Sequence, residues 1–219
     1  MIKLVIFDLD GTLLNTIDDL ADCTNYVLQK YGYPTHEVDA YKYFVGSGVV
    51  MLLKRALPED IPEKVFENIH KDFMHHYEIH KENKTKPYDG MVETLEKLRK
   101  KGILLAIATN KPQEMLPNLL KHYFPTIHWA AVFGNRKDVP VKPNPQIIYD
   151  ILKATQIGKQ ETLYIGDTAV DMETAHNAGI IKVGALWGFR TKIELKQAHA
   201  DFMIKKPQEM IRIIFKTLS

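Results

Sequence analysis

The chain has 219 residues, 45% of them apolar and 26% charged, which excludes a disordered segment and predicts a packed globular fold. Its 29 basic and 27 acidic side chains give a net charge of +2 without a run of five or six like charges, so we expect a small-molecule partner and no nucleic acid. No apolar stretch approaches the length of a membrane span, and no membrane partner is expected. Cys23 is the only cysteine, which excludes an internal disulfide and favours a cytoplasmic location; the oligomeric state is left open.

Short apolar runs alternate with helical patterns along most of the chain. Residues 2–7 form a nearly continuous run rich in β-branched side chains, which is typical of a parallel strand covered on both faces. Later runs of this kind end at polar or glycine residues, and they cover 104–108, 130–133, 162–165 and 181–186. Helices are predicted between them, for example over 91–101 and 145–154. The alternation predicts an α/β fold with a doubly wound parallel sheet.

Residues 15–83 break this alternation, because they contain amphipathic helical stretches and no good strand. A first helix is expected from Thr16 to Gly32, with others over 49–57 and 62–81, and 82–87 is a polar return linker. The pattern predicts an inserted all-α domain over 15–83 and a catalytic core made of 1–14 and 84–219.

Polar side chains end three of the predicted strands. They are Asp8, the pair Thr109-Asn110, and Asp167 after Gly166. Ligands of open α/β sheets bind outside the carboxyl ends of the strands, so these side chains are expected to converge. Residues two apart on an extended chain share a face, which places Asp10 on the side of Asp8.

This group of acids predicts a metal site. Asp8, Asp10, Asp167 and Asp171 would repel one another without a cation or a proton between them, and oxygen ligands without cysteine suit Mg²⁺ holding a phosphate. The hydroxyl of Thr109, the loop amides after Asp8 and the ammonium of Lys142 can hold the anionic side of that phosphate.

The same residues resemble the four motifs of the haloacid dehalogenase-like phosphatases, in order and over essentially the whole chain. The motifs are Asp8-Leu9-Asp10-Gly11-Thr12, Thr109-Asn110, Lys142 with Pro143 and Pro145, and Gly166-Asp167 with Asp171. The resemblance implies a Rossmann-like core and a magnesium-dependent phosphoric monoester hydrolase that acts on a small phosphorylated metabolite.

The resemblance also implies roles for single residues. Asp8 would be the nucleophile that forms an aspartyl phosphate, and Asp10 would be the general acid and base. Asp8, the backbone carbonyl of Asp10, and Asp167 would ligate Mg²⁺, while Asp171 would orient metal-bound water. The remaining roles fall to residues that would bind the phosphoryl group, namely Thr109, Asn110 and Lys142.

The inserted segment resembles a type 1 helical cap, and its detail is similar to that of phosphoglycolate phosphatases. The residues concerned are Asp19-Leu20-Ala21 with Asn25, Val45-Gly46-Ser47-Gly48, and Arg55-Ala56-Leu57. Phosphoglycolate is therefore the first substrate candidate, ahead of other small phosphorylated acids, sugar phosphates and pyrophosphate. Many relatives carry an acidic residue and a serine where this chain has Asn15-Thr16, which puts the substrate in question and leaves the chemistry unaffected.

Other functions on related scaffolds stay open. A phosphomutase is disfavoured, because related β-phosphoglucomutases place a histidine soon after the first motif, where this chain reads Ile17-Asp18-Asp19. A phospho-acceptor signalling module is disfavoured by the Asp8 and Asp10 pair and by the insertion. A dehalogenase is disfavoured because those relatives lack the second aspartate.

Several residues also have structural interpretations. Thr109-Asn110 could cap a helix begun by Pro112, and Asp167 and Asp171 could be acids favoured at a helix N-terminus. Gly46-Ser47-Gly48 is either a turn between helices or a loop that faces the substrate. His76 and His80 are interpreted as solvated side chains, and Cys23 as a small core residue. Residues 187–190 form either an aromatic packing corner or a border of the site.

Overall fold

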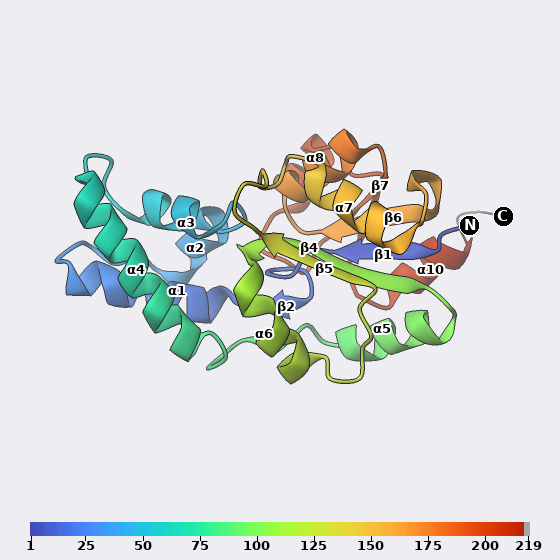
Figure 1. The fold of residues 1–219 in the computed structure, drawn as a ribbon, viewed down its shortest axis with the longest axis horizontal. Coiled ribbons are helices and arrows are strands. Elements are labelled where there is room, and N and C mark those ends of the chain that lie inside the picture. Colours follow the sequence, from blue (N-terminus) through green and yellow to red (C-terminus); the bar gives the residue numbers. More distant parts are fainter. Residues whose placement is uncertain (217–219) are drawn as a thin grey trace.

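The structure, a computed structural model, describes residues 1–216, and its centre is a six-stranded sheet with helices on both faces (Figure 1). All strand pairs of this sheet are parallel, in the order β5-β4-β1-β6-β7-β8. The strands are β1 Leu4–Phe7, β4 Leu104–Pro112, β5 Ala131–Asn135, β6 Thr162–Gly166, β7 Ile181–Ala185 and β8 Phe202–Ile204. The predicted doubly wound sheet is confirmed, and β8 is an edge strand that the sequence patterns did not indicate.

Alternating side chains of β1 pack in two different apolar layers, one on each face of the sheet. Leu4 and Ile6 join the layer beneath α7 and α8, whereas Val5 and Phe7 join the layer on the opposite face. Both faces of β1 are therefore buried, which explains its continuous apolar run. The flanking helices are α5 Met91–Lys100, α6 Leu116–Tyr123, α7 Gln146–Thr155, α8 Ala169–Ala178, α9 Lys192–Gln197 and α10 Glu209–Lys216.

Four helices form a separate layer beyond one end of the sheet, and we call this layer the cap (Figure 1). They are α1 Ile17–Lys30, α2 Val38–Phe44, α3 Val49–Ala56 and α4 Glu63–His80. Helix α1 packs against α4 and α2, and α3 packs against α2 and α4. The sequence patterns predicted α1, α3 and α4 but not the short α2. Cys23 is buried in this layer as a small apolar residue, as expected.

The two connections between sheet and cap lie side by side. The short strand β2, Leu14–Asn15, pairs antiparallel with β3, Lys86–Pro87. The carboxylate of Asp19 accepts hydrogen bonds from the backbone N–H groups of Lys84, at 2.9 Å, and Thr85, at 2.8 Å. These contacts favour the proposed division of the chain into 1–14 with 84–219 and an inserted 15–83.

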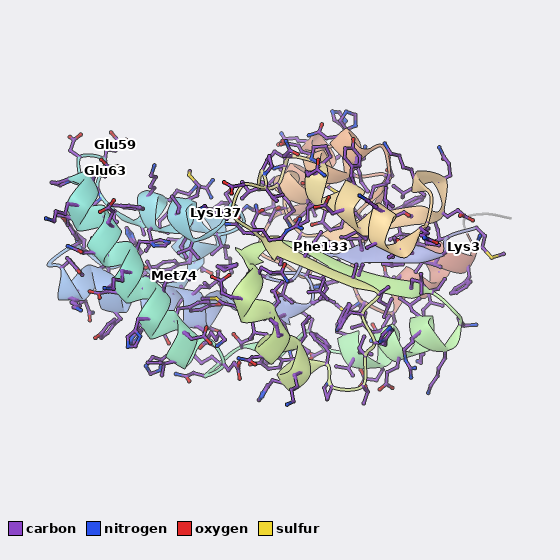
Figure 2. All side chains as sticks on the ribbon, viewed as in Figure 1. Lys3, Glu59, Glu63, Met74, Phe133 and Lys137 are labelled. Carbon is purple, nitrogen blue, oxygen red and sulfur yellow. The ribbon has the colours of Figure 1, made fainter. Side chains whose placement is uncertain are left out.

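The long axis of the molecule runs from the cap to the start of β1. Figure 2 shows Glu63, at the first turn of α4, and Lys3, just before β1, at opposite ends. Among residues 1–216, no helix is both long and apolar enough to cross a membrane.

Candidate active site

The carboxyl ends of β1, β4 and β6 bring the predicted site residues together. Asp8 follows β1, Thr109 and Asn110 lie near the end of β4, and Asp167 follows β6. All four are buried, as is Lys142 in the loop before α7. The convergence expected from a parallel sheet is therefore present.

Lys142 is the cationic centre of this arrangement. Its Nζ atom donates to Asp8 Oδ1 at 2.8 Å, to Asp171 Oδ1 at 2.7 Å and to the Tyr164 hydroxyl at 2.8 Å. Asp171 Oδ2 accepts from the backbone N–H and the hydroxyl of Thr168, which caps α8. Asp171 is thus both an acid in the first turn of a helix and the anchor that holds Lys142 beside Asp8.

Asp167 is fixed by donors from two loops and by close glycine contacts. The Thr12 hydroxyl donates to Asp167 Oδ1 at 3.1 Å, and the backbone N–H of Phe189 donates to Oδ2 at 2.8 Å. A Cβ atom on Gly11, whose φ is +91°, would lie 2.4 Å from Asp167 Oδ2. Glycine at position 11 is required both by this conformation and by the approach of the acid.

Three carboxylates form a compact acidic group. One oxygen each of Asp8, Asp167 and Asp171 can be chosen so that all three lie within 4.8 Å of one another. Burial and the neighbouring Asp171 raise the pKa of Asp8 to about 7, although Lys142 opposes the shift. Burial with the charges of Asp171 and Asp8 raises the pKa of Asp167 well above its ordinary value.

These shifts show that one lysine does not neutralise the acidic group. Burial opposes ionisation of Asp171, but the ammonium and hydrogen bonds of Lys142 lower its pKa, and Lys142 is shared between this acid and Asp8. A hard cation with oxygen ligands would stabilise the ionised forms of Asp8 and Asp167, and Mg²⁺ fits that requirement. The carboxylate of Asp10 lies outside the group, which is compatible with a ligand role for its backbone carbonyl only.

The Asn110 side chain is occupied by backbone groups. Its Oδ1 atom accepts from the Lys142 N–H at 2.9 Å, and Nδ2 donates to the carbonyls of Gly46, at 3.1 Å, and Lys142, at 3.3 Å. Asn110 therefore ties the Lys142 loop to the cap. A helix capped by Thr109-Asn110 and begun at Pro112 is a wrong interpretation, because β4 continues to Pro112 and a 3₁₀ turn, Gln113–Met115, follows it.

Lys111 is a buried site residue that the sequence interpretation missed. Its Nζ atom donates to Asp10 Oδ1 at 3.1 Å and to the hydroxyl of Tyr77, from α4, at 2.6 Å. Burial alone would lower the pKa of Lys111, but Asp10 and Tyr77 raise it above its ordinary value, so the amine stays charged. Its position between the strand-end pair Thr109-Asn110 and Pro112 could have identified it from the sequence, because a surface lysine is not expected there.

A cavity lies between the sheet edge and the cap. The cap side is mostly apolar, and Gly46 and Gly48 form part of it, so the glycine loop faces the site. The full lining is Asp8, Asp10, Leu20, Val45, Gly46, Gly48, Val49, Leu52, Tyr77, Thr109, Asn110, Lys111 and Pro112.

Residues 187–190 meet both sequence interpretations, because the backbone N–H of Phe189 contacts Asp167 while the Phe189 and Trp187 rings pack in the apolar core. The Trp187 indole N–H donates to the carbonyl of Thr12 at 3.0 Å. Arg190 Nη2 donates to the carbonyl of Val45 at 3.0 Å and lies 3.4 Å from that of Tyr43. A residue of the sheet domain thus holds the cap loop at Val45.

The pair His76 and His80 does not belong to this site. The His76 ring stacks on Tyr26 with centroids 3.7 Å apart, and His80 shares a hydrogen bond with the Asn83 side chain. Among residues 1–216, the group of Asp8, Asp167 and Asp171 is the only cluster of three or more potential metal-binding side chains.

The fold and this group of residues define a class of protein. Residues 5–185 match the family described as haloacid dehalogenase-like hydrolase, and the chain belongs to that family. It is 29% identical to the phosphoglycolate phosphatase of Vibrio parahaemolyticus, covering 97% of this chain and 96% of that protein. It is 31% identical to the phosphoglycolate phosphatase of Vibrio cholerae, covering 92% of each chain.

Solved structures agree with these sequence relatives. The crystal structure of a predicted phosphoglycolate phosphatase from Haemophilus somnus superimposes with a TM-score of 0.91 at 27% identity, covering 97% of each chain. The likeness therefore extends over the sheet and the cap alike.

Proposed function

We propose that this hydrolase cleaves a small phosphomonoester through an aspartyl phosphate on Asp8. The observation that carries the proposal is the placement of Asp8, which lies at the cavity with an ammonium 2.8 Å from one carboxylate oxygen. Asp10 lines the same cavity two residues along the chain. A nucleophilic carboxylate, a second acid and a fixed cation are the groups that phosphoryl transfer through an enzyme carboxylate requires.

Asp8, the backbone carbonyl of Asp10, and Asp167 would hold Mg²⁺. When bound, this ion supplies positive charge that balances the acids and the phosphoryl oxygens. Lys142 would supply a second charge, and the Thr109 hydroxyl, which lines the cavity, would donate to a phosphoryl oxygen. Asp171 acts on this site by holding the Lys142 ammonium in place.

The proposed reaction has two steps. An oxygen of Asp8 attacks phosphorus, the ester bond breaks, and the leaving oxygen takes a proton from Asp10. In the second step Asp10 takes a proton from water, the water oxygen attacks phosphorus, and the acyl phosphate bond to Asp8 breaks. Phosphate leaves, and Asp8 is again a free carboxylate.

The cap would select the leaving group and exclude bulk water. Its loop and helices α3 and α4 form the wall opposite Asp8. Phosphoglycolate is the first candidate substrate, since the relatives reported above carry that name.

A panel of phosphorylated metabolites assayed with Mg²⁺ tests this function. We expect turnover of small phosphomonoesters, highest for phosphoglycolate, and loss of turnover in excess chelator that Mg²⁺ restores. Undiminished turnover in chelator would exclude the proposed role of the acids as metal ligands. Phosphate transfer to a sugar hydroxyl in place of water would make the chain a phosphomutase.

A further inference from the structure

We propose that Lys111 and Tyr77 form a carboxylate-binding subsite that selects phosphoesters of small hydroxy acids. The inference rests on the proposed phosphatase function and adds to it the residues that bind and select the leaving group. One donor comes from the end of β4 and the other from helix α4 of the cap. A bound carboxylate would therefore bridge core and cap.

The Lys111 ammonium has bonding capacity left over. It carries three N–H donors. Asp10 and the Tyr77 hydroxyl take two of them, with Asp10 Oδ1 at 3.1 Å and Oδ2 at 3.3 Å from Nζ. Both contacts to Asp10 are longer than that to Tyr77, so one N–H shared between the two Asp10 oxygens would leave the third for a bound ligand, and Lys111 lines the cavity.

The Tyr77 hydroxyl supplies a second donor. It accepts the hydrogen bond from Lys111 at 2.6 Å, which leaves its own proton available for another acceptor. Tyr77 is 1% exposed and lines the same cavity, so that proton has no bulk water to bond. Two adjacent donors, an N–H and an O–H, match the two oxygens of a carboxylate.

The rest of the cap wall gives this pair its selectivity. Leu20, Val45, Val49 and Leu52 offer only apolar side chains to the cavity. Lys111 is the only cationic side chain among the lining residues that the structure describes. An anionic leaving group thus finds a single cationic side chain on this wall.

The distance from the reacting atoms fits a short hydroxy acid. The leaving oxygen must lie within about 3 Å of the Asp10 carboxylate to receive its proton. Lys111 Nζ lies 3.1 Å from that same carboxylate. A carboxylate separated from the ester oxygen by a single carbon can then reach Lys111, whereas a longer acid would be forced against the apolar wall.

The competing interpretation is that Lys111 only orients Asp10. That role would affect two alkyl phosphates to a similar degree, because both leave as alkoxides that need the proton of Asp10. A carboxylate subsite predicts an additional loss confined to acidic substrates. A pair of substrates that differ in the carboxylate separates the two.

The experiment compares kcat/KM for phosphoglycolate and for ethyl phosphate, which has a methyl group in place of the carboxylate. The variants are Lys111→Met and Tyr77→Phe, with Lys121→Met on the exposed surface of α6 as the matched control. We expect Lys111→Met to lower kcat/KM for phosphoglycolate about 100-fold more than for ethyl phosphate, since the carboxylate loses its charged partner. Tyr77→Phe should lower the same ratio about fivefold, and the control should leave it unchanged.

Equal losses on both substrates in Lys111→Met and Tyr77→Phe would overturn the subsite and leave Lys111 as a positioning residue for Asp10. Wild-type enzyme that hydrolyses ethyl phosphate as efficiently as phosphoglycolate would also overturn it, with the phosphatase function intact. Wild-type enzyme that hydrolyses neither would overturn the proposed function itself. If Lys111→Met fails to fold in thermal unfolding, the ratio measured on Tyr77→Phe decides.

Discussion

The two walls of the cavity are built from different groups. On the sheet edge, the contacts are made by side chains: Lys142 bonds Asp8 and Asp171, and Thr12 bonds Asp167. On the cap, the loop at Val45 and Gly46 bonds the core through backbone carbonyls. Gly46 accepts from a core asparagine and Val45 from a core arginine.

This difference separates the residues that perform the reaction from those that select the substrate. Side-chain contacts in the acidic group fix which residue types can be present, because each charge needs its partner. Backbone carbonyls require a loop conformation and leave the side chains of this loop free to vary. The sheet edge should therefore tolerate almost no change, and the cap should tolerate change at the cost of altered substrate choice.

The largest expected effect is at Asp8. Asp8→Asn removes the anionic nucleophile, so turnover should fall on the order of 10⁴- to 10⁶-fold. No covalent phosphoenzyme should form, as measured by intact mass after mixing with Mg²⁺ and an activated phosphate donor. Substantial remaining activity would contradict nucleophilic catalysis by this residue.

Asp10→Asn is the matched change on the neighbouring acid. It keeps the nucleophile and removes proton transfer, which is worth on the order of 10²- to 10⁴-fold at each step that needs it. With a good leaving group the first step needs little protonation, so this variant should accumulate one phosphate that hydroxylamine removes. A phosphate mapped to a residue other than Asp8 would show that the mechanism is wrong.

A glycine pair tests how closely the sheet edge is packed. A Cβ atom on Gly166 would lie 2.2 Å from Asp171 Cβ, whereas one on Gly158 would meet no atom within 4 Å. Gly166→Ala should therefore destabilise the fold by about 1–3 kcal/mol and displace the anchor of Lys142. Gly158→Ala should be neutral or slightly stabilising. Thermal unfolding compares them, and equal midpoints would contradict the packing described for Asp171.

Arg190 tests the backbone contacts of the cap loop. Arg190→Lys removes the fork that reaches the carbonyls of Val45 and Tyr43, and charged hydrogen bonds of this kind contribute about 1.5 kcal/mol. We expect KM to rise about tenfold with a smaller change in kcat. The control is Arg136→Lys, on an arginine that pairs with Asp150 near α7. A KM unchanged in both variants would show that the loop does not depend on Arg190.

Much of the core could be predicted from sequence because its signals are local. The continuous apolar run before Asp8 follows from burial on both faces, and a strand end followed by an acid marks the sheet edge. The edge strand β8 was missed because its three residues are too few for a periodic signal. Helix α2 is also short, at seven residues, and mixes charged with aromatic side chains.

The contacts between core and cap could not be predicted, because they join residues far apart in the chain. Lys111 and Tyr77 are separated by 34 positions, and neither side chain has an unusual neighbour in sequence. Asn110 was assigned to phosphate, yet its amide bonds backbone groups on both sides of the cavity. That assignment stays a prediction, and the structure adds a bridging role.

The smallest expected effect is at the apolar wall of the cap. Val49 lines the cavity, whereas its neighbour Val50 is 45% exposed and is not among the lining residues of that cavity. Val49→Ala removes two methyl groups from the wall that faces the leaving group, which should change the ratio of kcat/KM between phosphoglycolate and p-nitrophenyl phosphate by about 3- to 10-fold. Turnover of p-nitrophenyl phosphate itself should change less, because Val49 contacts none of the acids that perform the chemistry. Val50→Ala should leave the ratio unchanged. If both variants lowered kcat for both substrates equally, α3 would be a structural support of the site, and selection by the cap would have to lie in the loop at Gly46 to Gly48.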